Sequence, residues 1–259
     1  MLTVVPNQLY MPVETNLNTT GVLTITFATP AHNSLPASEL QALVEAINAA
    51  SANPDCGSII LRSGGDRTFC AGASFDELLA VTDEASGAKF FSGFASVINA
   101  ARRCAKPIVG RVQGKAVGGG VGLISACDLV YASKFASVRL SELAIGIGPF
   151  VIGPAVERKV GTAAFSDMAL RPDEWFPAAY AKTHGLYTEV LNDVESLDQA
   201  VATRARALAD YHPEAVHELK RVLWDGTDHW DDLLAERAAL SGRLVTRPFA
   251  RAAIEAVRS

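Results

Sequence analysis

The alternation of strand-like and helix-like segments over roughly the first 150 residues constrains the fold of this chain more than any other feature. "GVLTITFAT" (21–29) alternates apolar and polar residues as a strand does, and residues 36–54 then carry apolar residues at helical spacing. Further strands are predicted over 56–64, 106–117, 128–133 and, with a turn, 137–148; helices are predicted over 85–104 and 119–127, and a loop entering a helix over 64–80. Strands that alternate with helices build β-β-α or β-α-β units, so the sequence predicts an α/β fold.

From about residue 154 the pattern becomes mostly helical. Helices are predicted over 154–170, 177–183, 195–211, 213–224 and 230–257. Residues 1–15 read as a first strand or lead-in, and no long linker interrupts the chain. We therefore expect an α/β core with the active site over residues 1–190, followed by a helical C-terminal region over 191–259.

Composition and charge restrict the classes of partner. The 259 residues are 49% apolar and 20% charged, which is typical of a globular chain long enough to bury a large core. A net charge of −5 disfavours nucleic acid and anionic membranes as partners. No apolar run approaches the length of a membrane span, and no charged segment precedes an apolar one at the N-terminus. We expect a cytoplasmic protein.

Cysteine and histidine spacing gives no sign of a metal or redox centre. The four cysteines contain no CxxC pair and are expected to be free thiols: Cys56, Cys70, Cys104 and Cys127. The five histidines have neither HxxxH nor HExxH spacing. The prediction is that the protein binds no metal.

The glycine-rich stretch "GKAVGGGVGLISACD" (114–128) joins a predicted strand to a predicted helix. It is not a dinucleotide fingerprint, because Gly120-Val121-Gly122 is followed by Leu-Ile-Ser rather than by a third glycine at the required spacing. Nor is it a Walker A loop, because Gly114-Lys115 is followed by alanine. Two interpretations remain: an oxyanion hole built from N–H groups at a helix start, or close packing of the helix on the strand.

A second loop-to-helix boundary favours the oxyanion hole. "FCAGASFDEL" (69–78) contains Ala71-Gly72-Ala73, and two such turns could direct two N–H donors at one carbonyl oxygen. The candidate base is Glu142 in "VRLSELAIGIGP" (138–149), which lies among apolar residues. Desolvation would raise the pKa of its carboxyl group, as a general base requires. The alternative is a helix-capping glutamate after Ser141.

Three motifs in this order, "FCAGASFDEL", "GKAVGGGVGLISACDLVYAS" and "SELAIGIGP", resemble the crotonase, or enoyl-CoA hydratase/isomerase, superfamily. The similarity runs over essentially the whole chain. The resemblance implies a crotonase-like spiral of β-β-α units whose C-terminal helices form a homotrimer or a hexamer. It also implies an acyl-CoA thioester substrate and no cofactor, coenzyme A being part of the substrate.

The resemblance also implies roles for individual residues. The N–H groups of Ala73 and Gly119 would hold the thioester oxygen, and Glu142 would be the catalytic acid and base. Ala71 and its neighbours would lie along the CoA moiety. The remaining residues expected at the substrate are Gly72, Ser74, Gly118, Gly122 and Pro149.

One departure from the family pattern bears on the reaction. Hydratases of this family use two glutamates, and Gly122 stands at the first position while Glu142 stands at the second, twenty positions later. The 3,2-enoyl-CoA isomerases also lack the first glutamate, and they carry a Pro-Phe like Pro149-Phe150. Dienoyl-CoA isomerases place an aspartate where Phe150 stands. Because one base suffices to move a proton between two carbons, we expect isomerisation of a 3-enoyl-CoA.

Other functions remain open at this point. A hydratase, dehydratase or decarboxylase of the same superfamily could use Glu142 together with a group that the sequence does not reveal. Asp76 stands where many members have a lysine near the adenine, which bears on how CoA would be contacted. A non-catalytic acyl-CoA-binding or scaffold protein on the same fold is the alternative of another class.

Overall fold

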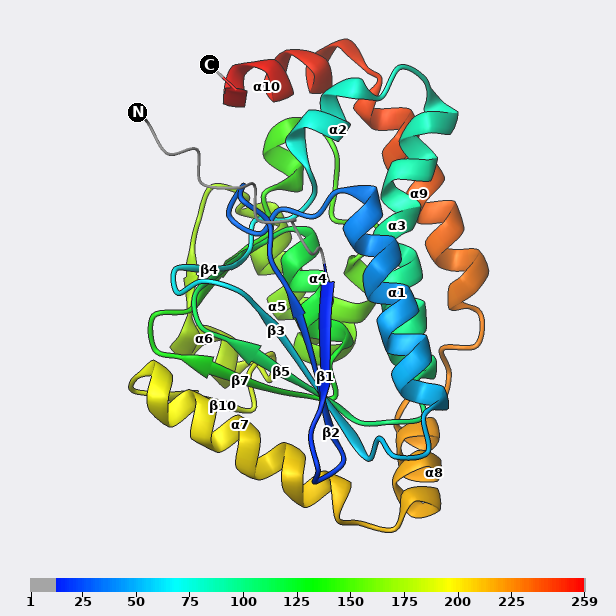
Figure 1. Ribbon diagram of the computed structural model, residues 1–259. Helices are drawn as coiled ribbons and strands as arrows, with labels where there is room; N and C mark the ends of the chain where they lie inside the picture. The colour runs from blue at the N-terminus through cyan, green and yellow to red at the C-terminus, as the bar shows by residue number, and fades with distance from the viewer. Residues whose placement is uncertain (1–12, 259) are drawn as a thin grey trace, which may run out of the picture.

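The computed structural model describes residues 13–258, with side chains through residue 256, and its main sheet has six strands (Figure 1). Their order across the sheet is β1 (Val13–Leu17), β2 (Val22–Phe27), β3 (Ser58–Ser63), β5 (Ile108–Val112), β7 (Leu129–Ser133) and β10 (Glu189–Leu191). β1 pairs with β2 antiparallel, and every other pairing is parallel. The part of the predicted first strand that precedes residue 13 lies outside the described residues.

A second, smaller sheet positions the candidate site. Its strands lie in the order β4 (Thr68–Cys70), β6 (Lys115–Val117), β8 (Ser137–Arg139) and β9 (Phe176–Pro177). β4, β6 and β8 are parallel, so the segments that follow them leave the same edge of the sheet. β4 itself was not predicted, since residues 64–80 read as a loop entering a helix.

The predicted single strand over 106–117 is wrong, because β5 and β6 belong to different sheets. The chain crosses between them at Gln113 and Gly114. The buried Gln113 amide donates to Ser63 Oγ at 2.9 Å and to Thr68 O at 3.0 Å, which replaces the ladder hydrogen bonds lost at the bend. A side chain at Gly114 would overlap the Arg67 carbonyl, so the crossing requires glycine.

Helices cover both faces of the main sheet (Figure 1). α1 (Ala37–Ala52), α3 (Glu84–Arg103) and α9 (Trp230–Val245) pack together on one face. α7 (Val194–Ala209) crosses the other face, where Leu197 and Val201 pack on Val22, Val109 and Tyr131. Before α10, the remaining helices are α2 (Phe75–Ala80), α4 (Gly119–Ala126), the 3-10 helix η1 (Glu142–Ile145), α5 (Gly153–Leu170), α6 (Ala178–Thr183) and α8 (Pro213–Leu223).

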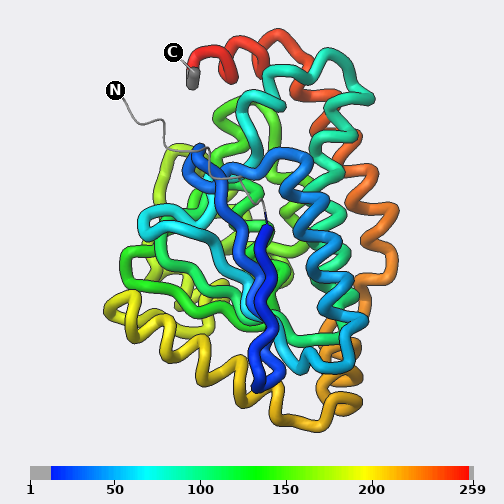
Figure 2. The backbone as a smooth tube through the Cα atoms, viewed as in Figure 1, coloured from blue at the N-terminus to red at the C-terminus, as the bar shows by residue number. Residues whose placement is uncertain are grey.

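The predicted single helix over 230–257 is also wrong. α9 ends at Val245 and α10 (Pro248–Arg258) begins three residues later, because the Pro248 ring cannot continue the preceding helix. α10 then turns back over α2 and η1 (Figure 2). Arg251 fixes it there by donating hydrogen bonds to the carbonyls of Leu79 and Val81.

The mixture of strands and helices confirms the predicted α/β class. The proposed boundary at residue 190 falls inside β10, and the division into a core and a C-terminal region stays a prediction. Among residues 13–258, no helix has both the length and the apolar character that a membrane span requires.

Candidate active site

The glycine-rich turn after β6 leaves one backbone donor free. Gly118 has φ 49° and ψ −116°, a conformation that favours glycine, and its N–H donates to Arg139 O at 2.9 Å. Its own carbonyl accepts from the N–H groups of Val121 and Gly122. Gly119 is the first residue of α4, and its N–H has no acceptor among the residues that the structure describes.

The turn after β4 leaves a second donor free beside the first. Leu35 N donates to Gly72 O at 2.8 Å and Ser74 N donates to Leu35 O at 3.1 Å. These two bonds hold Ala73 between them, and its N–H has no acceptor within residues 13–258. A Cβ on Gly72 would lie 3.7 Å from Gly119 N, so the two turns are neighbours. The pair has the composition of an oxyanion hole.

Glu142 lies against the glycine-rich turn after β6. A Cβ on Gly118 would lie 2.8 Å from Glu142 Oε1, so the carboxylate rests on the Cα of this glycine. Glu142 Oε2 is buried and has no hydrogen-bond partner in the described part of the chain. Burial raises the pKa of the Glu142 carboxyl group to about 7, against smaller opposing effects of its backbone and of Arg139. The capping interpretation finds no support, because Ser141 makes no side-chain cap bond.

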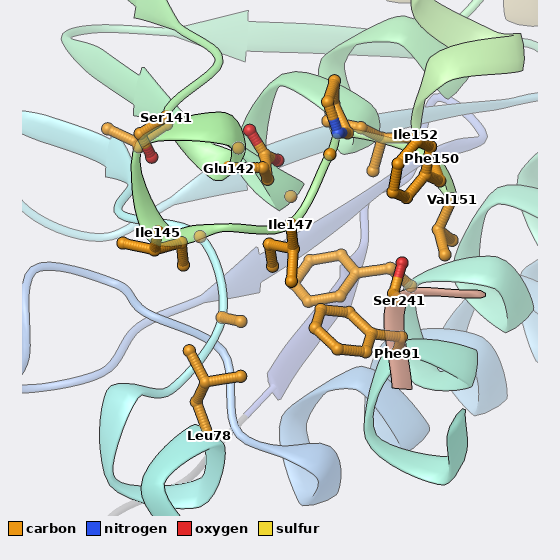
Figure 3. Close-up of a pocket in the computed structure, with 18 of the residues that line it drawn as sticks. Leu78, Phe91, Ser141, Glu142, Ile145, Ile147, Phe150, Val151, Ile152 and Ser241 are labelled. Atoms are coloured by element: carbon orange, nitrogen blue, oxygen red, sulfur yellow. The ribbon is translucent and has the colours of Figure 1, made fainter. Parts of the chain in front are cut away.

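The turns and Glu142 open onto a cavity of about 300 Å³. Its walls are mainly apolar, and Figure 3 shows Leu78, Phe91 and Ile147 facing it. The other apolar walls come from Phe75, Phe90, Phe94, Ile145, Phe150, Val151 and Ile152. The charged or hydroxyl-bearing residues that line it are Arg139, Ser141, Glu142, Asp173 and Ser241. A carboxylate in such surroundings is poorly hydrated, which agrees with its raised pKa.

The structure brings most of the predicted site residues together. Those that line the cavity are Ala71, Gly72, Ala73, Gly118, Gly119, Glu142 and Pro149. Ser74 does not line it; its hydroxyl caps α2 by accepting from Glu77 N at 3.4 Å. Gly122 does not line it either, because it is buried within α4.

The position of Gly122 is closed by Ile152. A Cβ on Gly122 would overlap Ile152 Cγ2, and it would lie 2.8 Å from Ile152 Cβ. Ile152 itself lines the cavity and is 4% exposed. Position 122 therefore has no room for a side chain unless Ile152 moves.

Phe90, Phe91 and Phe94 can be named from the sequence as residues that bear on the acyl chain, but the cavity that they form cannot. Phe94 of α3 packs so closely on Gly119 that any Cβ there would overlap its ring, and no local pattern links these two segments. Asp173 comes from the loop before β9, whose strand pairing is equally remote in sequence. Arg139 could have been found, since it precedes Glu142 by three positions in the same motif.

No group of three or more His, Cys, Asp or Glu side chains within residues 13–258 is arranged to hold a metal ion. Cys70 packs against Gly120 at the start of α4, and burial raises the pKa of its thiol to about 12. Its thiol is therefore not a nucleophile at neutral pH.

Comparisons with known proteins bear on the family of the chain. The model of the family described as Enoyl-CoA hydratase/isomerase matches residues 18–256. A peroxisomal Delta(3,5)-Delta(2,4)-dienoyl-CoA isomerase of Arabidopsis thaliana is 30% identical over 194 residues, 69% of this chain and 68% of the relative. A (7aS)-7a-methyl-1,5-dioxo-2,3,5,6,7,7a-hexahydro-1H-indene-carboxyl-CoA hydrolase of Mycobacterium tuberculosis is 28% identical over 220 residues, 82% of this chain and 84% of the relative.

A solved structure gives the same result for the fold. An enoyl-CoA hydratase from Mycobacterium avium subsp. paratuberculosis superposes with a TM-score of 0.83 at 26% identity, covering 96% of each chain. The expected crotonase-like fold is confirmed.

Proposed function

The chain belongs to the enoyl-CoA hydratase/isomerase family, and we propose that it moves the double bond of a 3-enoyl-CoA thioester to the 2-position. One observation carries the proposal: within the described residues, a carboxylate with a buried, unpaired Oε2 lines the same cavity as two free N–H donors, and Ile152 closes position 122, where hydratases are expected to carry their first glutamate. Adding water requires groups that hold and deprotonate it. Moving one proton between two carbons requires only one base.

The geometry suggests a role for each group. The thioester oxygen accepts hydrogen bonds from the N–H groups of Ala73 and Gly119, which stabilise the negative charge of an enolate. Glu142 takes the proton from C2 and returns it at C4, so no atom is gained or lost. A carboxyl pKa of about 7 allows Glu142 to accept and donate at neutral pH. The apolar walls keep water from the enolate.

Two other reactions of the family each have one observation in their favour. Dienoyl-CoA isomerisation is the activity in the name of the Arabidopsis relative, but Phe150 stands where we expect the aspartate of those enzymes and lines the cavity. Hydration would be favoured by Asp173, the other carboxyl residue that lines the cavity. If Asp173 is this second group, Asp173→Asn abolishes hydration of a 2-enoyl-CoA. If isomerisation is the reaction, Asp173→Asn leaves the rate within about threefold, because Asp173 is exposed and takes no part in moving the proton.

We also propose that the protein is a homotrimer or hexamer in the cytoplasm and uses no cofactor beyond the CoA of its substrate. Support for an oligomer comes from large apolar side chains left exposed in this single chain, including Leu170 (72%) and Phe249 (70%). Measuring the mass of the protein in solution by light scattering tests the oligomeric state, and a monomer at micromolar concentration would contradict the proposed trimer or hexamer.

The function is tested with Glu142→Gln and a 3-enoyl-CoA, followed by the appearance of the conjugated thioester absorbance. Removing the proposed base should lower kcat by at least about 1,000-fold with a small change in KM, within the range that general bases contribute. Glu195→Gln, which neutralises an exposed carboxylate on α7, is the matched control and should leave kcat unchanged. Activity surviving in Glu142→Gln would mean that another group moves the proton.

A binding protein without activity is distinguished by measuring binding and turnover on the same set of esters. Calorimetric binding of acyl-CoA esters with no turnover across a series of 2- and 3-enoyl chains would replace the isomerase proposal with a binding module. We expect turnover, because a binding site has no need of a carboxylate kept unpaired in an apolar wall.

A further inference from the structure

Arg139 is a cationic residue in the wall of the cavity. It lines the same cavity as Glu142 and ends β8. Its Nε is buried and has no hydrogen-bond partner in the described part of the chain. Among residues 13–258, no salt bridge within 4.0 Å joins it to Glu142, to Asp173 or to any other carboxylate. A guanidinium remains charged at any physiological pH, so its charge and donors remain available to a ligand.

The Arg139 side chain is held in place by packing. Its guanidinium carbon lies 5.2 Å from the centre of the Trp175 ring, in a cation–π contact. Its backbone is paired with Val117 of β6, and its carbonyl accepts from Gly118 N. The residue is thus built into the strand that supports the oxyanion turn. A guanidinium held on an aromatic face loses less conformational entropy on binding a planar anion than a freely moving one would.

The order of the small sheet places Arg139 on the acyl side of the substrate. The strands of this sheet lie in the order β4, β6, β8 and β9, so the segments that follow β4, β6 and β8 lie in that order along one edge. Ala71, expected along CoA, follows β4, and the donor Gly119 follows β6. Arg139 ends β8, and Trp175 immediately precedes β9. A thioester whose CoA lies over β4 and whose carbonyl lies at β6 therefore extends its acyl chain toward β8 and Arg139.

From this placement we infer that Arg139 is a specificity-determining residue that binds a carboxylate carried by the acyl chain of the substrate. The inference rests on the proposed acyl-CoA function and adds the class of acyl group: an acid-bearing chain rather than a plain hydrocarbon. Two N–H groups of a guanidinium match the two oxygens of a carboxylate. The surrounding apolar walls strengthen this pairing relative to water.

The test compares saturated CoA esters of equal chain length, with and without a terminal carboxylate, for example adipyl-CoA and hexanoyl-CoA. Their affinities are measured by calorimetry, so no turnover is needed. The wild-type protein should bind the acid-bearing ester more tightly. In Arg139→Gln the affinity for the acid-bearing ester should fall by about 10- to 100-fold, which is the contribution expected of hydrogen bonds between charged groups. The affinity for the plain ester should change little.

A matched control comes from the same aromatic ring. Lys115 Nζ lies 4.7 Å from the centre of Trp175, but Lys115 is exposed and does not line the cavity. Lys115→Gln removes the same charge and should leave the preference unchanged. If Arg139→Gln folds poorly, the comparison of the two esters on the wild-type protein still decides. Equal binding of the two esters by the wild-type protein would overturn the inference.

CoA phosphates are the other anions that Arg139 could bind, and pantetheine thioesters distinguish the two because they carry none. The inference predicts that the carboxylate preference and its loss in Arg139→Gln persist with pantetheine esters. A loss seen with every CoA ester and absent with pantetheine esters would assign Arg139 to phosphate and overturn it. The binding test does not depend on isomerisation, because saturated esters have no double bond to move. If the protein preferred acid-bearing esters but did not isomerise a 3-enoyl-CoA, the proposed function would be overturned and the role of Arg139 would stand.

Discussion

At the residue scale, two glycines of the site are required for different physical reasons. Gly118 needs its φ of 49°, and its bare Cα lets the Glu142 carboxylate rest 2.8 Å from where a Cβ would stand. Gly122 is required by space, because Ile152 occupies the volume into which its side chain would extend. The second close contact excludes a glutamate at position 122, which is why we propose Glu142 as the base.

The contact between Gly122 and Ile152 can be measured by a double-mutant cycle in urea. Gly122→Ala should lower the free energy of unfolding by about 1–3 kcal/mol, because it overpacks the core. In an Ile152→Ala background, the same substitution should cost at least about 1 kcal/mol less, since Cγ2 is gone. Equal costs in the two backgrounds would show that Ile152 does not close this position.

The pKa of Glu142 predicts the pH dependence of the rate. A base must be ionised to accept the C2 proton, and burial raises the pKa of Glu142 to about 7. The value of kcat/KM should therefore rise with pH and level off above about 7. A rate that is already flat from about pH 5.5 upward would contradict the burial of this carboxylate, since an ordinary glutamate titrates near 4.3.

At the element scale, local patterns located the two turns that line the cavity but not the elements that long-range contacts create. The glycines of 118–122 and Ala71–Ala73 marked two loop-to-helix boundaries, because helix starts have local chemical rules. The split of 106–117 depends on Gln113 reaching Ser63 and Thr68, far away in sequence. β4 likewise forms only because it pairs with a strand remote in sequence. The break between α9 and α10 did have a local signal, Pro248, but the prediction of one helix followed the apolar spacing instead.

The contact between α3 and α9 shows the same dependence on remote partners. A Cβ on Gly87 would lie 2.7 Å from Gly242 Cα, and one on Gly242 would overlap the backbone at Ala88. Gly242→Ala should therefore lower the free energy of unfolding by about 1–3 kcal/mol, despite the better helix propensity of alanine. Ala235→Ser, on the exposed face of α9, should change it by less than about 0.5 kcal/mol. A stabilised Gly242→Ala in urea unfolding would mean that the helices are farther apart.

At the scale of the whole molecule, the site has a cost in stability. A carboxyl group whose pKa is raised by folding stabilises the folded state fully only below its unfolded pKa, and this contribution is lost as pH rises through the folded pKa. For Glu142 the loss falls between about pH 4.3 and 7. Above that range, an unpaired buried charge destabilises the whole fold.

Glu142→Gln should therefore be more stable than the wild-type protein at pH 8, by on the order of 2 kcal/mol after allowing for partial hydration of the site. Near pH 4 the two proteins should be about equally stable. Urea unfolding at both pH values measures the difference. A variant that is less stable than the wild-type protein at pH 8 would indicate that the ionised Glu142 has a partner.

The most direct measurement of the central claim is the mass of the product that the wild-type protein makes from a 3-enoyl-CoA. In the proposed reaction Glu142 moves a proton and adds no water, because Ile152 closes position 122, where the hydratases carry their first glutamate. Mass spectrometry in ¹⁸O-labelled water should therefore find a 2-enoyl-CoA of unchanged mass, with the conjugated absorbance rising in step. A product heavier by one labelled water, or an unconverted substrate, would contradict the account.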